Sequence, residues 1–168
     1  MYYIGVDLGT SSVKLVLMRE NGEITKVVSK EYELFFPKTG WSEQNPGDWY
    51  RQSVAGIKEL IKDVKKEEVA GISFGEQMHG LVILDSNDEV LRPAILWNDG
   101  RTGEECDYLN NVIGREKISR YTANMALTGF TAPKLLWVKK QEPEIFYRIA
   151  KIMLPKDYLA YRFTGVHC

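Results

Sequence analysis

The chain has 168 residues, of which 44% are hydrophobic and 27% are charged, a balance typical of a globular domain with a real core. Its formal net charge of −1 gives no electrostatic support to binding of nucleic acid or of an acidic membrane surface. No apolar run approaches the ~20 residues that span a bilayer, and no signal peptide is evident. The two cysteines, Cys106 and Cys168, form neither a disulfide framework nor a metal-binding pattern, so we expect a reducing, cytoplasmic setting.

The first informative stretch, Tyr3–Lys14, predicts a β-hairpin with a hydroxyl-rich tip. A short apolar run carries Asp7 near its end, Gly9 permits a sharp turn, and a second strand begins at Val13. The turn consists of Thr10, Ser11 and Ser12. Such a turn offers donors to anionic oxygens, and a carboxylate beside it suits hydrated Mg²⁺ next to a nucleotide phosphate. An ordinary hairpin with a polar turn and a solvated aspartate explains the same residues, because D-x-G-T is a short pattern.

A third strand is predicted over Ile24–Leu34, followed by a loop over Phe35–Asn45. Asn45 before Pro46 is typical of a helix N-cap with proline at the first helical position. The predicted apolar face of this helix consists of Tyr50, Val54, Ile57, Ile61 and Val64. Its predicted solvated face carries Arg51, Lys58, Glu59, Lys62 and Lys66.

The rest of the chain alternates between short strands and helices. Strands are predicted over Val69–Phe74, which is apolar enough to be buried, and over Gly80–Leu84 and Ala94–Trp97. Helices are predicted over Glu104–Val112, Arg115–Tyr121, Pro133–Lys140, Pro143–Ala150 and Lys156–Phe163, the last as a candidate exposed apolar patch. Three antiparallel strands, then a helical crossover to a further strand, indicate an α/β fold with a mixed sheet and helices packed on it.

Polar residues lie between Gly75 and Gly80, at the end of a predicted strand, which is where α/β proteins place ligand contacts. His79 has an imidazole that can donate to or accept from a sugar hydroxyl, and Met78 would supply an adaptable apolar wall. A hydrogen-bonded structural histidine is the alternative.

A second strand end breaks into polar residues at Leu96–Arg101. Trp97 could stack on the apolar face of a small polyol, while Asn98, Asp99 and Arg101 could bond its hydroxyls. Alternatively, this is a capped loop in which Asp99 pairs with Arg101. The sequence contains no G-x-x-x-x-G-K-[ST], G-x-G-x-x-G or H-E-x-x-H pattern, no Cys/His cluster and no nucleophile elbow.

Together these stretches resemble the FGGY family of carbohydrate kinases, most closely its xylulokinase branch. The resemblance runs in register over essentially the whole chain. It is carried by Y-I-G-V-D-L-G-T-S-S-V-K, G-W-S-E-Q-N-P-G-D-W-Y, G-E-Q-M-H-G, R-P-A-I-L-W-N-D-G-R-T, G-F-T-A-P-K-L-L-W-V, Q-E-P-E-I-F and L-P-K-D-Y-L. Glycerol kinases are similar here but carry an Arg-Glu pair where this sequence has Met78-His79.

The resemblance implies a ribonuclease-H-like, actin-type fold, with ATP, Mg²⁺ and sugar bound between two such domains. Residues 1–168 would be the N-terminal one, itself incomplete. Asp7 is implied to support Mg²⁺ and the phosphates. The implied phosphate-binding residues are Gly9, Thr10, Ser11, Ser12 and Lys14, the last near the transferred phosphoryl group. Met78 and His79 are implied to contact the sugar, with Trp97, Asn98 and Asp99 in a second sugar-side segment.

The implied activity is ATP-dependent phosphorylation of D-xylulose on its 5-hydroxyl, by a whole protein that forms a homodimer. The family's general base is an aspartate in a later segment, and its adenosine pocket lies in the second domain. Neither lies within these 168 residues, so we expect the chain to be inactive alone. Two alternatives stay open: another substrate, such as ribulose, glycerol or gluconate, or a non-catalytic actin-like module that binds a sugar or a partner.

Overall fold

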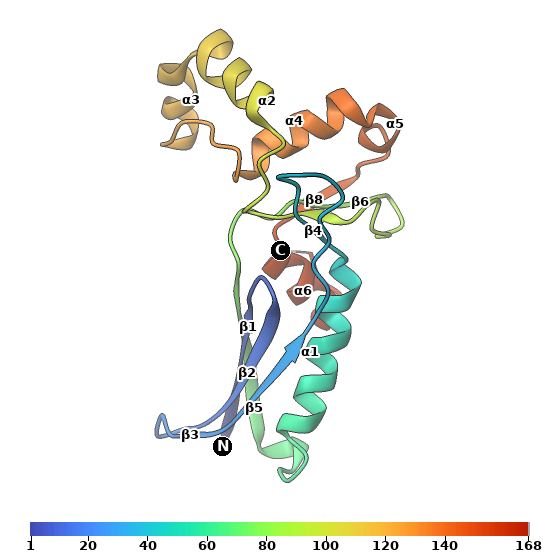
Figure 1. Cartoon of the computed structure of the whole chain (residues 1–168). Helices are drawn as coiled ribbons and strands as arrows, with labels where there is room; N and C mark the ends of the chain where they lie inside the picture. The colour runs from blue at the N-terminus through green and yellow to red at the C-terminus, as the bar shows by residue number, and fades with distance from the viewer. Residues whose placement is uncertain (168) are drawn as a thin grey trace. The chain divides into compact units, whose positions relative to one another are not determined.

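The computed structural model describes residues 1–167, which divide into two compact units. Unit 1 comprises Met1–Leu34, Asn45–Gln77 and the segment from Pro155 onward. Unit 2 comprises Phe35–Gln44 and Met78–Leu154. Each unit is therefore built from segments that are distant in the sequence, and Figure 1 follows them by colour.

Unit 1 is built on a mixed four-stranded sheet of order β3-β2-β1-β5. Its elements are β1 (Tyr2–Leu8), β2 (Ser12–Arg19), β3 (Ile24–Glu31), α1 (Pro46–Leu60), the 3-10 helix η1 (Lys66–Glu68), β5 (Val69–Glu76) and α6 (Pro155–Thr164). β1, β2 and β3 pair antiparallel, whereas β5 pairs parallel to β1 after the α1 crossover. The predicted opening of three antiparallel strands and a helical crossover is confirmed, although β3 ends three residues before the predicted Leu34.

Helix α1 begins as predicted, since the Asn45 side chain caps it by accepting from the Gly47 N–H and Pro46 occupies its first turn. The predicted apolar face is wrong by one position. The buried residues of α1 are Pro46, Trp49, Ser53, Gly56 and Leu60. A Cβ on Gly56 would lie 2.4 Å from Leu15 Cδ1 of β2, so the helix approaches the sheet through its smallest side chains. The larger apolar side chains beside that stripe are therefore half-buried.

Strand β5 forms where it was predicted but is not buried. It lies at an edge of the sheet, with β1 as its neighbour, and Ile72 is 39% exposed. Helix α6 is not the exposed apolar patch that its sequence suggested. Its Tyr158 and Leu159 are buried, and the Tyr158 ring lies 6.4 Å from that of Trp49.

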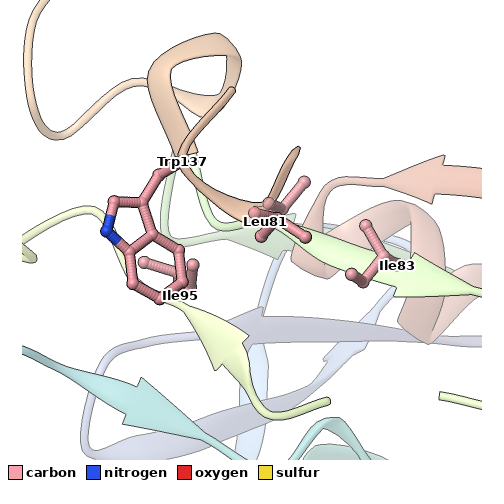
Figure 2. Close-up of a cluster of buried hydrophobic side chains, with 5 residues drawn as sticks. Leu81, Ile83, Ile95 and Trp137 are labelled. Carbon is pink, nitrogen blue, oxygen red and sulfur yellow. The ribbon is translucent and has the colours of Figure 1, made fainter. Parts of the chain in front are cut away.

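Unit 2 combines two small antiparallel sheets, β4-β7 and β6-β8, with short helices. Its elements are β4 (Glu43–Gln44), β6 (Val82–Leu84), β7 (Ala94–Ile95), α2 (Gly103–Asp107), the π-helix η2 (Tyr108–Gly114), α3 (Arg115–Thr122), α4 (Thr131–Gln141), α5 (Pro143–Phe146) and β8 (Lys151–Met153). Its hydrophobic core contains Leu81, Ile83, Ile95, Trp137 and Val138 (Figure 2).

The elements of unit 2 differ from the predicted ones mainly at their ends. The helix predicted over Glu104–Val112 is α-helical only to Asp107 and continues as a π-helix. Ile152 and Met153 belong to β8, which pairs with β6 through Val82 and Met153. Such pairings join distant parts of the chain, which local patterns do not reveal.

Candidate functional site

Asp7 and Lys14 face each other at one end of the unit 1 sheet. They are paired residues of β1 and β2, and Gly75 of β5 is paired with Asp7 on its other side. Paired residues of neighbouring strands project to the same face of a sheet. The predicted hairpin therefore brings one carboxylate and one ammonium to the same surface, beside a residue that has no side chain.

This surface is hollowed into a cavity of about 500 Å³. Its lining residues are Gly5, Val6, Asp7, Lys14, Val16, Ser73, Phe74 and Gly75. The glycines keep it open: a Cβ on Gly5 would lie 2.9 Å from Val16 Cγ2, and one on Gly75 would lie 3.6 Å from Asp7 Oδ1. The cavity is thus bounded by a charged pair at one end and by small residues along its length.

The hairpin tip is tight and is held by Tyr32, the residue that follows β3. The Gly9 N–H donates to the Ser12 carbonyl oxygen at 3.0 Å, and a Cβ on Gly9 would lie at that same distance from this oxygen. The Tyr32 hydroxyl donates to the Gly9 carbonyl oxygen, and its N–H donates to the Ser11 carbonyl oxygen at 3.3 Å. Burial raises the pKa of Tyr32, and the Asp7 charge adds to the effect, so Tyr32 remains a donor. Tyr32 was not predicted as a site residue, because a tyrosine within a predicted strand is typical of an ordinary strand.

The exposure of the tip fits ligand contact. Ser11 is exposed, and Thr10 and Ser12 are half-buried. Asp7 and Lys14 are exposed as well. An exposed carboxylate beside N–H and hydroxyl donors is the chemistry that a nucleotide phosphate with its metal ion requires.

The Met78-His79 segment belongs to unit 2. Met78 is 61% exposed, and His79 has a φ of 60°, in the left-handed region that few non-glycine residues adopt. The His79 carbonyl oxygen accepts from Thr131 Oγ1 at 3.2 Å and from Lys134 Nζ at 2.7 Å, and its ring lies 4.3 Å from that of Phe130. Burial, and then the charge of Lys134, lower the pKa of His79, which favours the neutral imidazole. A neutral imidazole can both donate and accept a hydrogen bond.

The Trp97-Asn98 segment lies against the same part of unit 2. Trp97 is 46% exposed and Asn98 is also exposed. A Cβ on Gly129 would lie 2.5 Å from the Trp97 carbonyl oxygen, so only glycine fits there. Lys134 Nζ donates to the Gly129 carbonyl oxygen at 2.6 Å as well as to that of His79. Gly129 and Lys134 thus connect the two predicted sugar-side segments.

Asp99 is buried, whereas Trp97 and Asn98 are exposed. It is 2% exposed, and its carboxylate accepts from the Ser42 N–H at 2.6 Å and from Arg101 Nη2 at 2.7 Å. The Arg101 N–H and Nε donate to the other carboxylate oxygen, both at 2.9 Å. Of the two alternatives for Leu96–Arg101, the structure therefore has the loop in which Asp99 pairs with Arg101, and this pair is inside unit 2.

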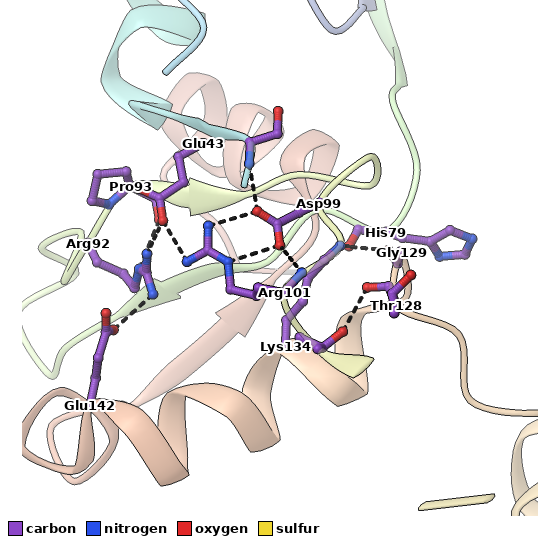
Figure 3. A network of polar contacts seen from close by, with 12 residues as sticks. Glu43, His79, Arg92, Pro93, Asp99, Arg101, Thr128, Gly129, Lys134 and Glu142 are labelled. Atoms are coloured by element: carbon purple, nitrogen blue, oxygen red, sulfur yellow. Dashed lines mark hydrogen bonds and ion pairs between the residues drawn. The ribbon is translucent and has the colours of Figure 1, made fainter. Parts of the chain in front are cut away.

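The Asp99–Arg101 pair is part of a larger buried network (Figure 3). Arg101 Nη1 lies 2.8 Å from Glu43 Oε1, and Arg92 bridges Glu43 and Glu142. The Arg101 guanidinium also lies 3.7 Å from the centre of the Trp41 ring. These interactions fix the loop that presents Trp97 and Asn98.

The structure thus brings the predicted site residues together in two groups, one in each unit. Asp7 and the phosphate-side residues belong to unit 1, and Met78, His79 and the second sugar-side segment belong to unit 2. Phe130, Thr131 and Lys134 were not predicted as site residues, although the G-F-T-A-P-K stretch carries part of the family resemblance. Within residues 1–167, no group of three or more His, Cys, Asp or Glu side chains is arranged to hold a metal. The helices of this part of the chain are all too short or too polar to cross a membrane.

Comparison with known proteins agrees with this arrangement. Residues 2–168 match the N-terminal domain of the FGGY family of carbohydrate kinases. The xylulose kinase of Bacillus subtilis is 48% identical over 167 residues, which are 98% of this chain and 33% of the relative. The structure of xylulose kinase from Rhodospirillum rubrum is similar with a TM-score of 0.94 at 30% identity, over 99% of this chain and 35% of that one.

A second solved structure is named for a different substrate. Gluconate kinase from Lactobacillus acidophilus gives a TM-score of 0.93 at 32% identity, over 99% of this chain and 34% of that one. The chain spans about a third of the length of the relatives that it matches. The predicted α/β fold of the ribonuclease-H-like, actin type is confirmed by these likenesses. The chain belongs to the FGGY family of carbohydrate kinases.

Proposed function

We propose that this chain is the N-terminal part of an ATP-dependent xylulose kinase, which transfers the γ-phosphoryl group of ATP to the 5-hydroxyl of D-xylulose. The observation that carries the proposal is the 48% identity to the Bacillus subtilis xylulose kinase over 98% of the chain. The Met78-His79 turn, in which Met78 is exposed and His79 half-buried, supports it, because that pair distinguishes this sequence from glycerol kinases.

On the nucleotide side, the residues of unit 1 suit a phosphate and its metal ion. Asp7 is a single exposed carboxylate, and Mg²⁺ is commonly bound through one or two carboxylates together with phosphate oxygens and waters. The hydroxyls of the tip would donate to phosphate oxygens, with Lys14 near the transferred group, and Gly9 would let the backbone come close to the phosphate. The tip residues proposed for this role are Thr10, Ser11 and Ser12. Mg²⁺, when bound, supplies neutralisation of the phosphate charge.

On the sugar side, His79 would exchange hydrogen bonds with a hydroxyl, and Met78 and Trp97 would cover apolar faces of the carbon chain. Asn98 would bond a second hydroxyl. Asp99 would act on the sugar through the loop that it fixes, since both its oxygens are taken by protein donors. The general base would come from a later segment of the whole protein, so this chain by itself would not turn over. The whole protein would be a cytoplasmic homodimer.

The test is ADP release with Mg-ATP and D-xylulose, measured on this chain and on the complete gene product side by side. We expect activity in the complete protein alone. Turnover by the chain alone would show that it does not need a base from elsewhere. A complete protein that uses glycerol or L-ribulose far better than D-xylulose would overturn the substrate assignment.

Gluconate is the second candidate substrate. It is favoured by one observation, the likeness to the gluconate kinase from Lactobacillus acidophilus at a TM-score of 0.93. A comparison of kcat/KM for gluconate and D-xylulose in the complete gene product decides between them. If folded protein uses no sugar at all, a non-catalytic binding module becomes the better explanation.

A further inference from the structure

Lys134 is a buried cation that the function proposed above does not use. Its side chain is 0% exposed, and no carboxylate in residues 1–167 forms an ion pair with it. A buried ammonium is costly unless other groups replace its hydration. Here the replacements are two main-chain carbonyl oxygens, those of His79 at 2.7 Å and Gly129 at 2.6 Å. From α4, Lys134 therefore binds two loops, one at His79 and one at Gly129.

The loop at His79 is one that needs support. A non-glycine residue at a φ of 60° is in an unfavourable conformation. The N-terminal end of α4 and the residue before it supply three contacts that hold it: the Lys134 Nζ and Thr131 Oγ1 hydrogen bonds to the His79 carbonyl oxygen, and the Phe130 ring beside the imidazole. Figure 3 shows the His79 carbonyl oxygen turned toward Lys134 and the imidazole pointing away from it.

Lys134 acts on both sugar-side segments at once. Its second acceptor, Gly129, packs so closely on the Trp97 carbonyl that no Cβ fits between them. The nearby charged groups that influence Lys134 are Asp99 and Arg101, which are themselves paired. Because Nζ is fully enclosed, it cannot touch a sugar and can act only through the loops that it holds.

We propose that Lys134 is a positioning residue for the sugar site, whose hydrogen bonds to the His79 and Gly129 carbonyls fix the imidazole and the Trp97 segment relative to each other. This inference rests on the proposed function for the identity of the ligand. The positioning itself concerns residues of unit 2 alone.

The test replaces Lys134 by methionine in the complete gene product, with Lys139→Met, an exposed position of the same helix, as the matched control. We expect Lys134→Met to raise KM for D-xylulose about tenfold or more, because the hydrogen bonds from Nζ to two main-chain carbonyls are lost, while KM for ATP stays unchanged. Thr131→Val removes a weaker donor to the same carbonyl and should shift KM in the same direction by less. It also keeps the test valid if Lys134→Met does not fold.

A second readout does not depend on turnover. The charge of Lys134 lowers the pKa of His79, so the NMR titration of His79 in Lys134→Met should move toward higher pH. The His79 signal is assigned by its loss in His79→Gln. An unchanged KM for the sugar in folded Lys134→Met would overturn the proposal, whereas the His79 titration shows only that the Lys134 charge lies close to the imidazole. If the wild-type protein prefers another sugar, the same KM comparison is made with that sugar. If it phosphorylates none, the proposed function fails, and the positioning role is decided by NMR: the signals of the Trp97 indole should move in Lys134→Met and stay in place in Lys139→Met.

Discussion

Asp7 and Lys14 are directly opposite each other on β1 and β2, and both line the same cavity on one face of the unit 1 sheet. The pairing sets a negative and a positive group side by side, next to a turn that is rich in hydrogen-bond donors. In phosphoryl transfer the protein contributes mainly positioning and charge stabilisation. The role of Asp7 can be tested by removing its charge without changing the size of the side chain.

Asp7→Asn keeps the shape of the side chain and removes its charge. We expect kcat of the complete gene product to fall about 10²-fold or more, because a fixed charge that stabilises the transition state is lost. Raising the Mg²⁺ concentration should recover part of the activity if Asp7 supports the metal. Asp63→Asn, the same change at an exposed position of unit 1, is the control and should leave ADP release unchanged. Wild-type kinetics in Asp7→Asn would remove Asp7 from the site.

His79→Ala tests the sugar side separately. We expect the Kd for D-xylulose, measured by calorimetry on the complete gene product, to rise about tenfold through loss of a hydrogen bond. Binding of ATP should not change, because His79 belongs to unit 2 and the proposed phosphate contacts to unit 1. His167→Ala makes the same substitution at an exposed histidine and serves as the control. Equal affinities in both variants would make His79 a structural residue, the alternative that its sequence left open.

The sequence predicted those parts of the fold that depend on local patterns. The hairpin, the Asn45–Pro46 start of α1 and the mixed sheet could be read from turn residues, capping residues and periodicity. The buried stripe of α1 could not, because packing against Leu15 selects Ser53 and Gly56 over larger apolar neighbours. Periodicity counts hydrophobic residues and does not register close approach through small ones.

The site was predictable to a similar extent. Glycines and polar residues at strand ends pointed to Asp7, the hairpin tip and the Met78-His79 turn. Lys134 escaped notice because a lysine in a helix reads as a solvated residue, and its burial depends on two loops far away in the sequence. Asp99 shows the converse case, since a polar residue at a strand end proved to be buried in an ion pair.

Arg101→Met tests the energy of the buried network. Arg101 pairs with the carboxylates of both Asp99 and Glu43, and the substitution removes this shared partner. Breaking a buried ion pair costs about 3–5 kcal/mol. We expect the free energy of unfolding, measured in urea, to fall by about this amount. Lys140→Met removes an exposed pair with Glu104 and should cost less than about 1 kcal/mol. Similar losses in the two variants would mean that the network contributes little.

The buried Lys134 predicts a dependence of stability on pH. Burial lowers the pKa of Lys134 to about 7 in the folded chain, against 10.5 for an ordinary lysine. Between these values the unfolded state binds the proton more strongly, so the free energy of unfolding should rise with pH across this window. Lys134→Met lacks the titrating group. The stability of wild type relative to Lys134→Met should therefore increase from pH 7 upward, as measured by urea unfolding. A difference that does not vary with pH would contradict a lowered pKa.

Gly56 and Leu15 give the sharpest test of how α1 docks on the sheet. A Cβ on Gly56 would lie 2.4 Å from Leu15 Cδ1, and Leu15 is 0% exposed, so its side chain has little room to move. We expect Gly56→Ala to lower the free energy of unfolding by about 1–3 kcal/mol through overpacking, despite the better helix propensity of alanine.

The controls for Gly56→Ala separate overpacking from propensity. Gly103→Ala adds a methyl group where nothing lies within 4 Å, so it should be neutral or stabilising. Leu15→Val combined with Gly56→Ala shortens the side chain that the new methyl group meets, and the pair should lose less stability than the sum of the single changes. If the double variant instead loses the full sum, the cost of Gly56→Ala does not arise at Leu15.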